Sequence, residues 1–154
     1  MSGNNYYFTK AGIDDLPQLK KIAQQVIRHN YTSFLGQEAV ESFISSGASD
    51  KEIEDNLPDC TLLKIEDEIM SFGITFGNLI HLIMVGVPYQ RKSYGTMLMQ
   101  YLESKLFEQY NEISLQTFSA NKNAIGFYVK NGWAVAETKN ESGMELIIFS
   151  KTKQ

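Results

Sequence analysis

Residues 85–100 decide the fold of this chain, and they read Val-Gly-Val-Pro-Tyr-Gln-Arg-Lys-Ser-Tyr-Gly-Thr-Met-Leu-Met-Gln. An apolar run enters this stretch from Leu79 and predicts a strand over residues 79–87. Beyond the turn, apolar side chains recur with the i, i+3, i+4, i+7 spacing of one helical face, at Tyr94, Met97, Leu98, Tyr101, Leu102 and Leu106. The sequence therefore predicts a strand, a short polar turn and a helix in direct succession.

The turn between this strand and this helix has the properties of a phosphate site. The first N–H groups of a helix have no acceptor inside it, and the helix dipole adds partial positive charge there. Arg91 and Lys92 add two full charges at the same place. The stretch is not a Walker A loop, because no Gly-Lys-Ser/Thr follows. It is not the dinucleotide fingerprint either, because only one of its glycines, Gly95, falls in place.

The hexapeptide Gln90-Arg91-Lys92-Ser93-Tyr94-Gly95 resembles the Q/R-x-x-G-x-G/A motif of the GNAT superfamily of N-acetyltransferases. In that family the loop grips the pyrophosphate of acetyl-CoA. Ser93 stands where the family usually has its first glycine. If this position requires φ > 0, a serine there is strained, although its hydroxyl is able to donate a hydrogen bond to a phosphate.

The rest of the chain predicts a mixed α/β domain in the order β-α-α-α-β-β-β-α-β-α-β-β. The first helix is expected to have an acidic cap at Asp14-Asp15 and the third a capping box at residues 49–52. We expect the second helix to turn Ala39, Val40, Phe43 and Ile44 inward. Predicted strands cover about residues 6–10, 60–66, 69–76, 79–87, 113–118, 133–139 and 145–150, and predicted helices about 16–30, 36–46, 49–57, 94–106 and 122–130.

A second motif lies after the fifth predicted strand. Residues 121–133 read Asn-Lys-Asn-Ala-Ile-Gly-Phe-Tyr-Val-Lys-Asn-Gly-Trp, which is similar to the N-x-x-A-x-x-F-Y-x-K-x-G-F segment of the same family. The order of elements also resembles that of the family. The resemblance implies one acetyltransferase domain over residues 1–154, with a central, mostly antiparallel sheet of about seven strands. It implies that helices flank this sheet and that strands 4 and 5 splay apart.

The resemblance also implies where acetyl-CoA, the expected co-substrate, would bind. The family's pyrophosphate loop corresponds here to Gln90, Arg91, Lys92, Ser93, Tyr94, Gly95 and Thr96. Backbone N–H groups of Val85 and Val87 match the strand donors that face the thioester, and Gly86 between them permits a bulge. Asn121 either contacts the pantetheine arm or caps the following helix.

Acetyl transfer to an amine needs a neutral amine, donors for the tetrahedral oxyanion and a proton for the departing thiolate. Tyr128 matches the tyrosine that protonates the thiolate in many relatives, and its alternative role is aromatic packing beside Phe127. His81 lies four residues before Val85, so the alternation of a strand places both on one face. A histidine suits a base at neutral pH, but a polar residue at a strand start is the equal alternative.

Composition and charge exclude several classes of protein. The 154 residues, 43% hydrophobic and 21% charged, suit one globular domain. The chain has no apolar run near the ~18 residues of a membrane span, and residues 1–5 lack signal-peptide features. Its one cysteine, Cys60, cannot form an internal disulfide or, alone, a thiolate metal site. We therefore expect a cytoplasmic protein with no metal and no membrane partner.

The net charge of −4 argues against nucleic-acid binding. Residues 36–68 hold ten acids and two bases, whereas the remainder holds eight acids and twelve bases. The basic part contains the predicted phosphate turn. The acidic part either attracts a cationic partner or forms a solvated surface. If the acidic part attracts a partner, it favours a small cationic amine as the acceptor.

The sequence thus predicts an acyl-CoA-dependent N-acetyltransferase that moves an acetyl group to a primary amine by direct attack in a ternary complex. The acceptor is a small molecule or a protein amine, and dimers are common in the family. The alternative is a non-catalytic acyl-CoA-binding sensor or partner module on the same fold, which the serine at position 93 allows. A third reading keeps the fold without CoA binding.

Overall fold

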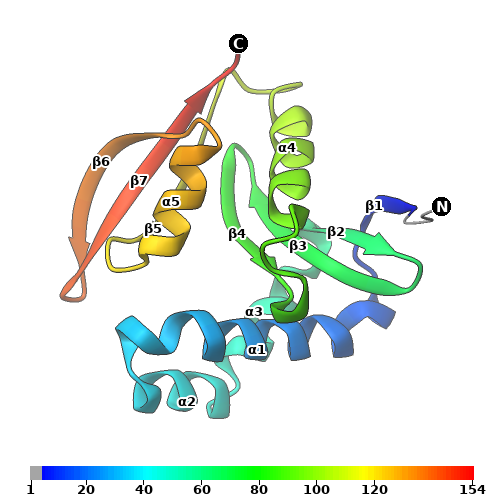
Figure 1. The fold of residues 1–154 in the computed structure, drawn as a ribbon, viewed down its shortest axis with the longest axis vertical. Helices are drawn as coiled ribbons and strands as arrows, with labels where there is room; N and C mark the ends of the chain where they lie inside the picture. The colour runs from blue at the N-terminus through cyan, green and yellow to red at the C-terminus, as the bar shows by residue number, and fades with distance from the viewer. Residues whose placement is uncertain (1–4) are drawn as a thin grey trace. The chain divides into compact units, whose positions relative to one another are not determined.

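The computed structural model describes residues 5–154, so the first four residues of the stretch used to argue against a signal peptide lie outside the described residues. The predicted order of helices and strands is confirmed (Figure 1), and three short 3-10 turns are present in addition among the described residues. The strands are β1 Tyr6–Lys10, β2 Cys60–Ile65, β3 Glu68–Phe76, β4 Leu79–Val85, β5 Glu112–Phe118, β6 Ala134–Glu141 and β7 Met144–Thr152. The helices are α1 Leu16–Leu35, α2 Gln37–Ser45, α3 Ala48–Asp55, α4 Tyr94–Leu106 and α5 Lys122–Lys130, and the 3-10 turns are η1 Ile13–Asp15, η2 Leu57–Asp59 and η3 Val87–Tyr89.

The strands form one seven-stranded sheet in the order β1-β2-β3-β4-β5-β7-β6. β4 and β5 pair in parallel, Leu79 with Ser114 and Ile80 with Leu115, whereas β1–β2, β2–β3, β5–β7 and β6–β7 are antiparallel. The predicted mixed α/β fold with a mostly antiparallel sheet and flanking helices is therefore confirmed. The described chain divides into two compact units, one of residues up to Ile74 with Leu82–Met99, the other of Thr75–His81 with Gln100–Gln154.

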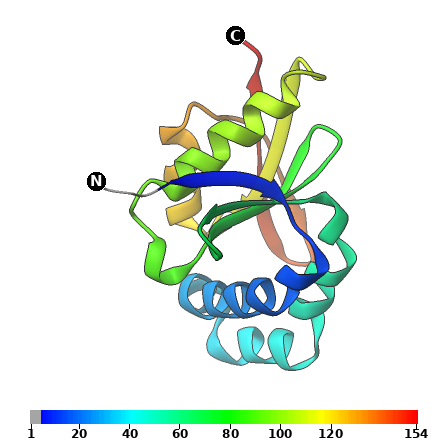
Figure 2. The same ribbon diagram turned by 90° about the vertical axis from the view of Figure 1, so that its right-hand side faces the viewer.

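In the first unit, α1 packs with α2 and α3 (Figure 2). The predicted apolar face of α1 is buried, at Leu19, Ile22, Ala23, Val26 and Ile27. Polar contacts tie the three helices together at their edges. Arg28 of α1 forms an ion pair with Glu41 of α2 at 2.8 Å, and Gln24 donates to Asp50 of α3 at 2.8 Å. Burial of the apolar face and these cross-helix contacts together fix the helical layer.

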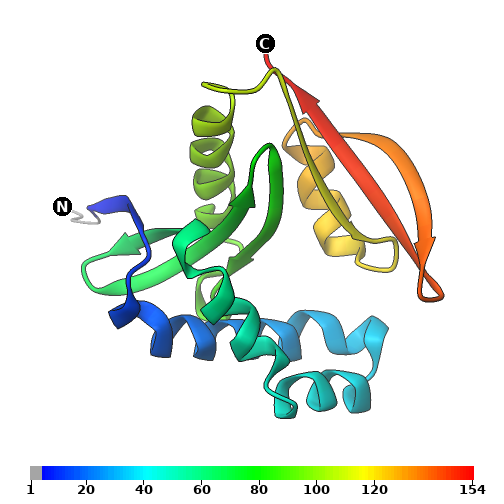
Figure 3. The same cartoon turned by 180° about the vertical axis from the view of Figure 1, so that it is seen from behind.

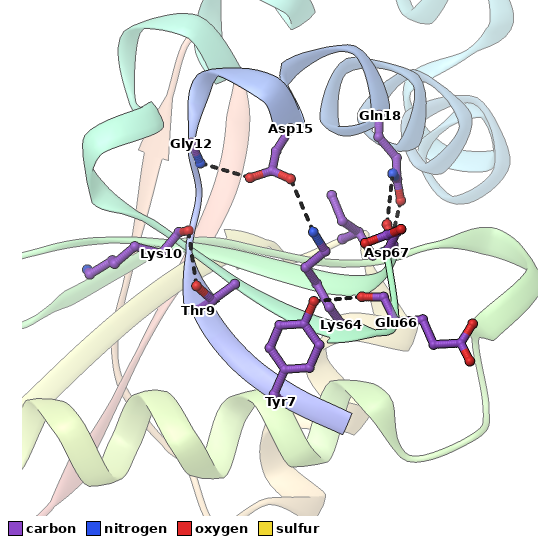
Figure 4. Close-up of polar contacts among 10 residues, drawn as sticks. Tyr7, Thr9, Lys10, Gly12, Asp15, Gln18, Lys64, Glu66 and Asp67 are labelled. Atoms are coloured by element: carbon purple, nitrogen blue, oxygen red, sulfur yellow. Dashed lines mark hydrogen bonds and ion pairs between the residues drawn. The ribbon is translucent and has the colours of Figure 1, made fainter. Parts of the chain in front are cut away.

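The entry into α1 is held by contacts with the preceding turn and with strands β2 and β3 (Figure 4). Asp15 Oδ2 accepts from the Gly12 N–H at 2.8 Å, and Asp15 Oδ1 lies 3.4 Å from Lys64 Nζ. Gln18 Oε1 accepts from the Ile69 N–H at 2.7 Å. The prediction that these acids cap α1 was wrong in detail, because the carboxylate of Asp15 binds the preceding turn and a strand lysine instead of the first N–H groups of α1.

The short helices α2 and α3 differ from the prediction in two respects. Val40 of α2 is buried and Ile44 half-buried, but Ala39 and Phe43 are exposed, because this short helix buries only a narrow stripe. α3 begins at Ala48, one residue before the predicted cap, since Gly47 starts it from a left-handed conformation with φ 87°. Ser49 consequently lies inside the helix, with its hydroxyl buried and without a hydrogen-bond partner among residues 5–154.

In the second unit, α5 covers one face of the strands β5, β7 and β6 (Figures 1 and 3). Phe149 of β7 is fully buried and pairs with Leu115 of β5, and its ring contacts that of Tyr128 of α5. β6 lies at the edge of the sheet with all eight residues exposed. A two-residue turn joins β6 to β7, and its residues Ser142 and Gly143 both have positive φ, as such hairpin turns require.

A buried polar cluster joins α4, β7 and the turn after α5 in the second unit. Glu103 of α4 is 8% exposed and accepts from Lys151 Nζ at 2.7 Å and from the Trp133 indole at 3.1 Å. Lys151 also donates to the Asn131 carbonyl at 2.7 Å. A buried carboxylate is stable only when its oxygens are paired in this way. The cluster therefore fixes the C-terminal end of α5.

Candidate functional site

The turn that precedes α4 has an uncommon backbone. Arg91 and Ser93 both lie in the left-handed region, with φ 63° and 74°. The Met97 N–H donates to the Ser93 carbonyl at 2.9 Å, so Ser93 is the residue from which the helix begins. The N–H groups of Tyr94, Gly95 and Thr96 consequently have no acceptor within the helix. Ser93 therefore adopts the positive φ at which a serine is strained.

Residues of β3 and β4 hold this turn in place. The buried Ser71 hydroxyl of β3 donates to the Tyr94 carbonyl at 3.3 Å. The Tyr89 hydroxyl donates to Glu68 Oε2 at 3.2 Å, and burial together with this carboxylate raises the pKa of the Tyr89 phenol. The Gln90 amide donates to the Val85 carbonyl at 3.0 Å. These hydrogen bonds hold the turn in place without a ligand. Binding a ligand there consequently costs less conformational entropy than binding to a mobile loop.

Two full positive charges project from the turn. Arg91 and Lys92 are both exposed. Among residues 5–154, no ion pair or hydrogen bond engages either side chain. Positively charged side chains without ion-pair partners, next to helix N–H groups that have no acceptor inside the helix, attract an anion with several phosphate oxygens. Of the other predicted loop residues, Gly95 is buried, and Tyr94 and Thr96 are half-buried at the start of α4.

The strand prediction was wrong at Val87. β4 ends at Val85, and Val87 begins the 3-10 turn η3, because Pro88 has no N–H for a continuing ladder. Gly86 between them has φ −54°, so its glycine is not needed for a left-handed backbone. A Cβ there would lie 3.1 Å from Cδ2 of Tyr89, so a larger residue at this position would require the Tyr89 ring to shift by a few tenths of an ångström.

Tyr128 lies in the second unit on α5 and is 9% exposed. Its ring makes edge contacts with Phe127 and Phe149, with centroids 5.6 Å apart in each case. The Trp133 N–H donates to the Tyr128 carbonyl at 3.0 Å, which joins this residue to the turn held by Glu103. The aromatic packing considered for Tyr128 is present, and its proton-donor role stays a prediction.

His81 lies on β4 and is exposed. Along this strand Ile80 and Met84 are buried while His81 is not, so the histidine belongs to the more open row of side chains. Its ring lies 4.9 Å from that of Phe76 at an angle of 38°. Its role as the base stays a prediction.

Asn121 caps α5. Its Oδ1 accepts from the Ala124 N–H at 3.3 Å, and its Nδ2 lies 3.4 Å from the Thr117 hydroxyl. The helix-cap alternative is therefore present in the structure, and contact with a pantetheine arm stays a prediction. Cys60 is 1% exposed at the start of β2, and burial with the nearby Asp15 raises the pKa of its thiol to about 12, as befits a core residue.

Sequence reasoning missed the contacts that support the turn. Asn30 of α1 lies 3.5 Å from the Gln90 amide, and Glu68 and Ser71 of β3 hold Tyr89 and Tyr94. Each of these pairs is separated by more than twenty residues, and no local pattern marks such a contact. Next to Asn30, burial raises the pKa of Tyr31, whose ring lies 5.5 Å from that of Phe34.

No helix within residues 5–154 combines the length and the apolar character that a membrane crossing requires. Across the same residues, His, Cys, Asp and Glu side chains form no group of three or more that could hold a metal ion. Among curated proteins, none matches the chain significantly.

Solved structures share the fold of this chain. It is similar to the PaiA N-acetyltransferase from Thermoplasma acidophilum in complex with coenzyme A, with TM-score 0.81, 19% identity and coverage of 97% of this chain and 99% of that one. It is also similar to a GCN5-related N-acetyltransferase from Rhodopseudomonas palustris, with TM-score 0.79, 17% identity and coverage of 99% and 98%. A third is the ribosomal-protein-S18-alanine N-acetyltransferase from Escherichia coli, with TM-score 0.70, 18% identity and coverage of 96% and 94%.

A sequence model of one family covers most of the chain. The model of the acetyltransferase (GNAT) family matches residues 24–133, which include the turn before α4 and all of α5. This match extends over more than half of the chain and agrees with the fold of the solved structures. The chain therefore belongs to the acetyltransferase (GNAT) family.

Proposed function

We propose that this protein is an N-acetyltransferase that uses acetyl-CoA to acetylate a primary amine. The observation that carries the proposal is the turn before α4. There the side chains of Arg91 and Lys92, which form no ion pair or hydrogen bond with any described residue, accompany helix N–H groups that have no acceptor inside the helix. The pyrophosphate of acetyl-CoA is the ligand of this chemistry that the family uses. Membership of the family and the coenzyme A complex of the Thermoplasma protein support the same cofactor.

The proposed reaction is direct attack of the amine on the thioester, with cofactor and acceptor bound together. The Val87 N–H, which donates to no described residue, would stabilise the tetrahedral oxyanion. His81, directly or through water, would accept the proton of the amine, and Tyr128 would protonate or hydrogen-bond the departing thiolate. The acceptor is a small-molecule or protein amine. Nucleic acid, membrane and metal have no part in this proposal.

We propose that residues 1–154 work as a single acetyltransferase domain in the cytoplasm, alone or as a homodimer. The lone buried Cys60 thiol suits a reducing compartment. The acidic stretch of residues 36–68 gives only weak support for a cationic acceptor. Several of its acids are already engaged, because Glu41, Glu54 and Asp55 form ion pairs and Asp50 accepts from Gln24.

The alternative is an acyl-CoA-binding module without catalysis. The observation that favours it is Ser93, a non-glycine residue held at φ 74° where the family has glycine. Both functions require cofactor binding, but only the enzyme releases thiol when an amine is supplied. The two are therefore separable by experiment.

Calorimetric titration with acetyl-CoA, with ATP and NAD as controls, tests the cofactor. We expect selective, saturable binding of acetyl-CoA. A panel of polyamines, amino acids, aminoglycosides and peptide amines, screened for thiol release, then tests transfer. Absence of acetyl-CoA binding at sub-millimolar concentration would contradict both functions. Binding without transfer to any amine of the panel would favour the module.

A further inference from the structure

Gln90 is the first residue of the motif expected to bind pyrophosphate, yet its side chain turns toward the protein. The amide Nε2 donates to the Val85 carbonyl at 3.0 Å and lies 3.5 Å from Asn30 Oδ1. The residue is half-buried, unlike the exposed Arg91 and Lys92 that follow it. The Gln90 amide therefore donates within the protein, to the end of β4 and toward α1. The donors of Arg91 and Lys92 bind no other described residue.

The peptide that Gln90 contacts is bound on both sides. The Val85 carbonyl accepts from Gln90, and the N–H of the same peptide, on Gly86, donates to the Met70 carbonyl at 2.9 Å. The next carbonyl, that of Gly86, accepts from the Tyr89 N–H at 2.8 Å. A peptide plane with both its polar groups bonded cannot rotate without losing a hydrogen bond.

One N–H of this segment is left over. Within residues 5–154, the Val87 N–H donates to no acceptor, although it follows directly on these bonded groups. This N–H belongs to the Gly86–Val87 peptide, and the carbonyl of that peptide accepts from the Tyr89 N–H. The peptide before it, Val85–Gly86, is bound by Gln90 and Met70. The direction of the Val87 N–H is therefore fixed. An unpaired, immobilised N–H is the donor that stabilisation of an oxyanion requires.

We propose that Gln90 is a positioning residue of the acetyl transfer and not a ligand of the pyrophosphate. By bonding the Val85 carbonyl it fixes the end of β4 and thereby aims the Val87 N–H at the thioester oxygen. Arg91, Lys92 and the first N–H groups of α4 hold the pyrophosphate. The part of this inference that concerns catalysis rests on the proposed function. The part that concerns structure, namely that the Gln90 side chain clamps the end of β4, rests on the contacts of Gln90 alone.

The test compares Gln90→Ala with Gln90→Arg, which keeps donors that can reach a carbonyl, and with Gln100→Ala as an exposed control on α4. Acetyl-CoA Kd is measured by calorimetry and kcat with an amine that the wild type accepts. For Gln90→Ala we expect kcat to fall about tenfold to a hundredfold, which is less than the roughly 10²–10³ that removal of an oxyanion donor costs because the Val87 N–H is misaligned and not lost, with Kd changed less than about threefold. Gln90→Arg should recover part of kcat, and Gln100→Ala should change neither value.

A second measurement does not depend on activity. Amide hydrogen exchange at Gly86 reports the bond to Met70, and we expect at least about a fivefold increase in exchange for Gln90→Ala as the segment opens. The control and Gln90→Arg should retain the protection. A wild type that binds or transfers nothing would contradict the proposed function, and the exchange result would still decide whether Gln90 clamps β4.

Three outcomes would overturn the inference. A tenfold or greater loss of acetyl-CoA affinity in Gln90→Ala, with kcat retained, would make Gln90 a pyrophosphate ligand. Unchanged exchange at Gly86 would show that the clamp does not hold the strand end. A fall in kcat that Gln100→Ala reproduces would show a general effect of substitution.

Discussion

At the scale of the residue, the turn before α4 carries backbone strain. Arg91 and Ser93 both adopt φ values that L-residues other than Asn and Asp rarely take. Ser71 and Tyr89 contribute hydrogen bonds that hold the turn against this cost, which is about 1–3 kcal/mol for a residue of this kind. Strain that persists because neighbouring contacts impose it is typical of ligand-binding turns.

Replacing Ser93 by glycine should relieve this strain. We expect Ser93→Gly to raise the free energy of unfolding by about 0.5–1 kcal/mol, because relief of the left-handed conformation outweighs the added freedom of the unfolded chain. Urea denaturation measures the change. Ser42→Gly in the exposed middle of α2 is the matched control and should lower stability by about 0.5 kcal/mol. Equal losses in both variants would show that Ser93 is unstrained.

The Cys60 thiol should be inert in the folded protein. With the pKa raised to about 12, almost no thiolate exists at pH 8, and the side chain is also 1% exposed. We therefore expect no reaction with a disulfide reagent at pH 8 over hours, and full reaction of one thiol in urea. Because the folded pKa lies above the unfolded one, thiolate formation favours unfolding only as the pH rises above the unfolded value near 8.5. Fast labelling of the native protein would contradict this.

At the scale of the element, sequence patterns located the helices and strands because periodicity reports local burial. The face of α1 and the bounds of α5 agree with the structure. The patterns failed where long-range contacts decide. Asp15 binds Gly12 and Lys64 instead of capping α1, and β4 stops at Val85. The candidate phosphate turn was found from its sequence, but nothing local marks the support from Asn30, Glu68 and Ser71.

The buried cluster around Glu103 should stabilise the junction of α4, α5 and β7. Glu103→Ala removes the only hydrogen-bond acceptor of the Trp133 indole among the described residues and leaves Lys151 with the Asn131 carbonyl alone, so we expect a loss of about 2–4 kcal/mol of unfolding free energy. Glu103→Gln keeps an acceptor for the indole and should lose about half as much. Urea denaturation followed by Trp133 fluorescence measures both. Glu108→Ala, on an exposed ion pair at 4.0 Å, should change stability by less than about 0.5 kcal/mol.

At the scale of the whole molecule, the question is whether the chain is an enzyme or a binding module. Tyr128→Phe removes only the phenol hydroxyl and should lower kcat about a hundredfold to ten-thousandfold with acetyl-CoA Kd retained, since a general acid contributes about 10²–10⁴. His81→Gln should lower kcat with acetyl-CoA Kd retained, because the amide side chain cannot act as a general base for the amine. Rates with a responsive amine from pH 6 to 9 measure both. Unchanged rates in both variants would remove these residues from the mechanism.

We propose that the turn before α4 holds the pyrophosphate of acetyl-CoA, and the cofactor affinity of a variant without the two charges of this turn tests that role. The measurement is calorimetric Kd for acetyl-CoA in the Arg91→Ala/Lys92→Ala double variant. The control is Lys21→Ala/Lys153→Ala, which removes the same net charge at two exposed lysines elsewhere. We expect the first variant to lose about tenfold to a hundredfold in affinity. Each charge-assisted hydrogen bond contributes about 1.5–3 kcal/mol, and solvent screening at these exposed side chains reduces that contribution. The control should lose less than about twofold. Equal affinity in the wild type and the Arg91/Lys92 variant would contradict the claim.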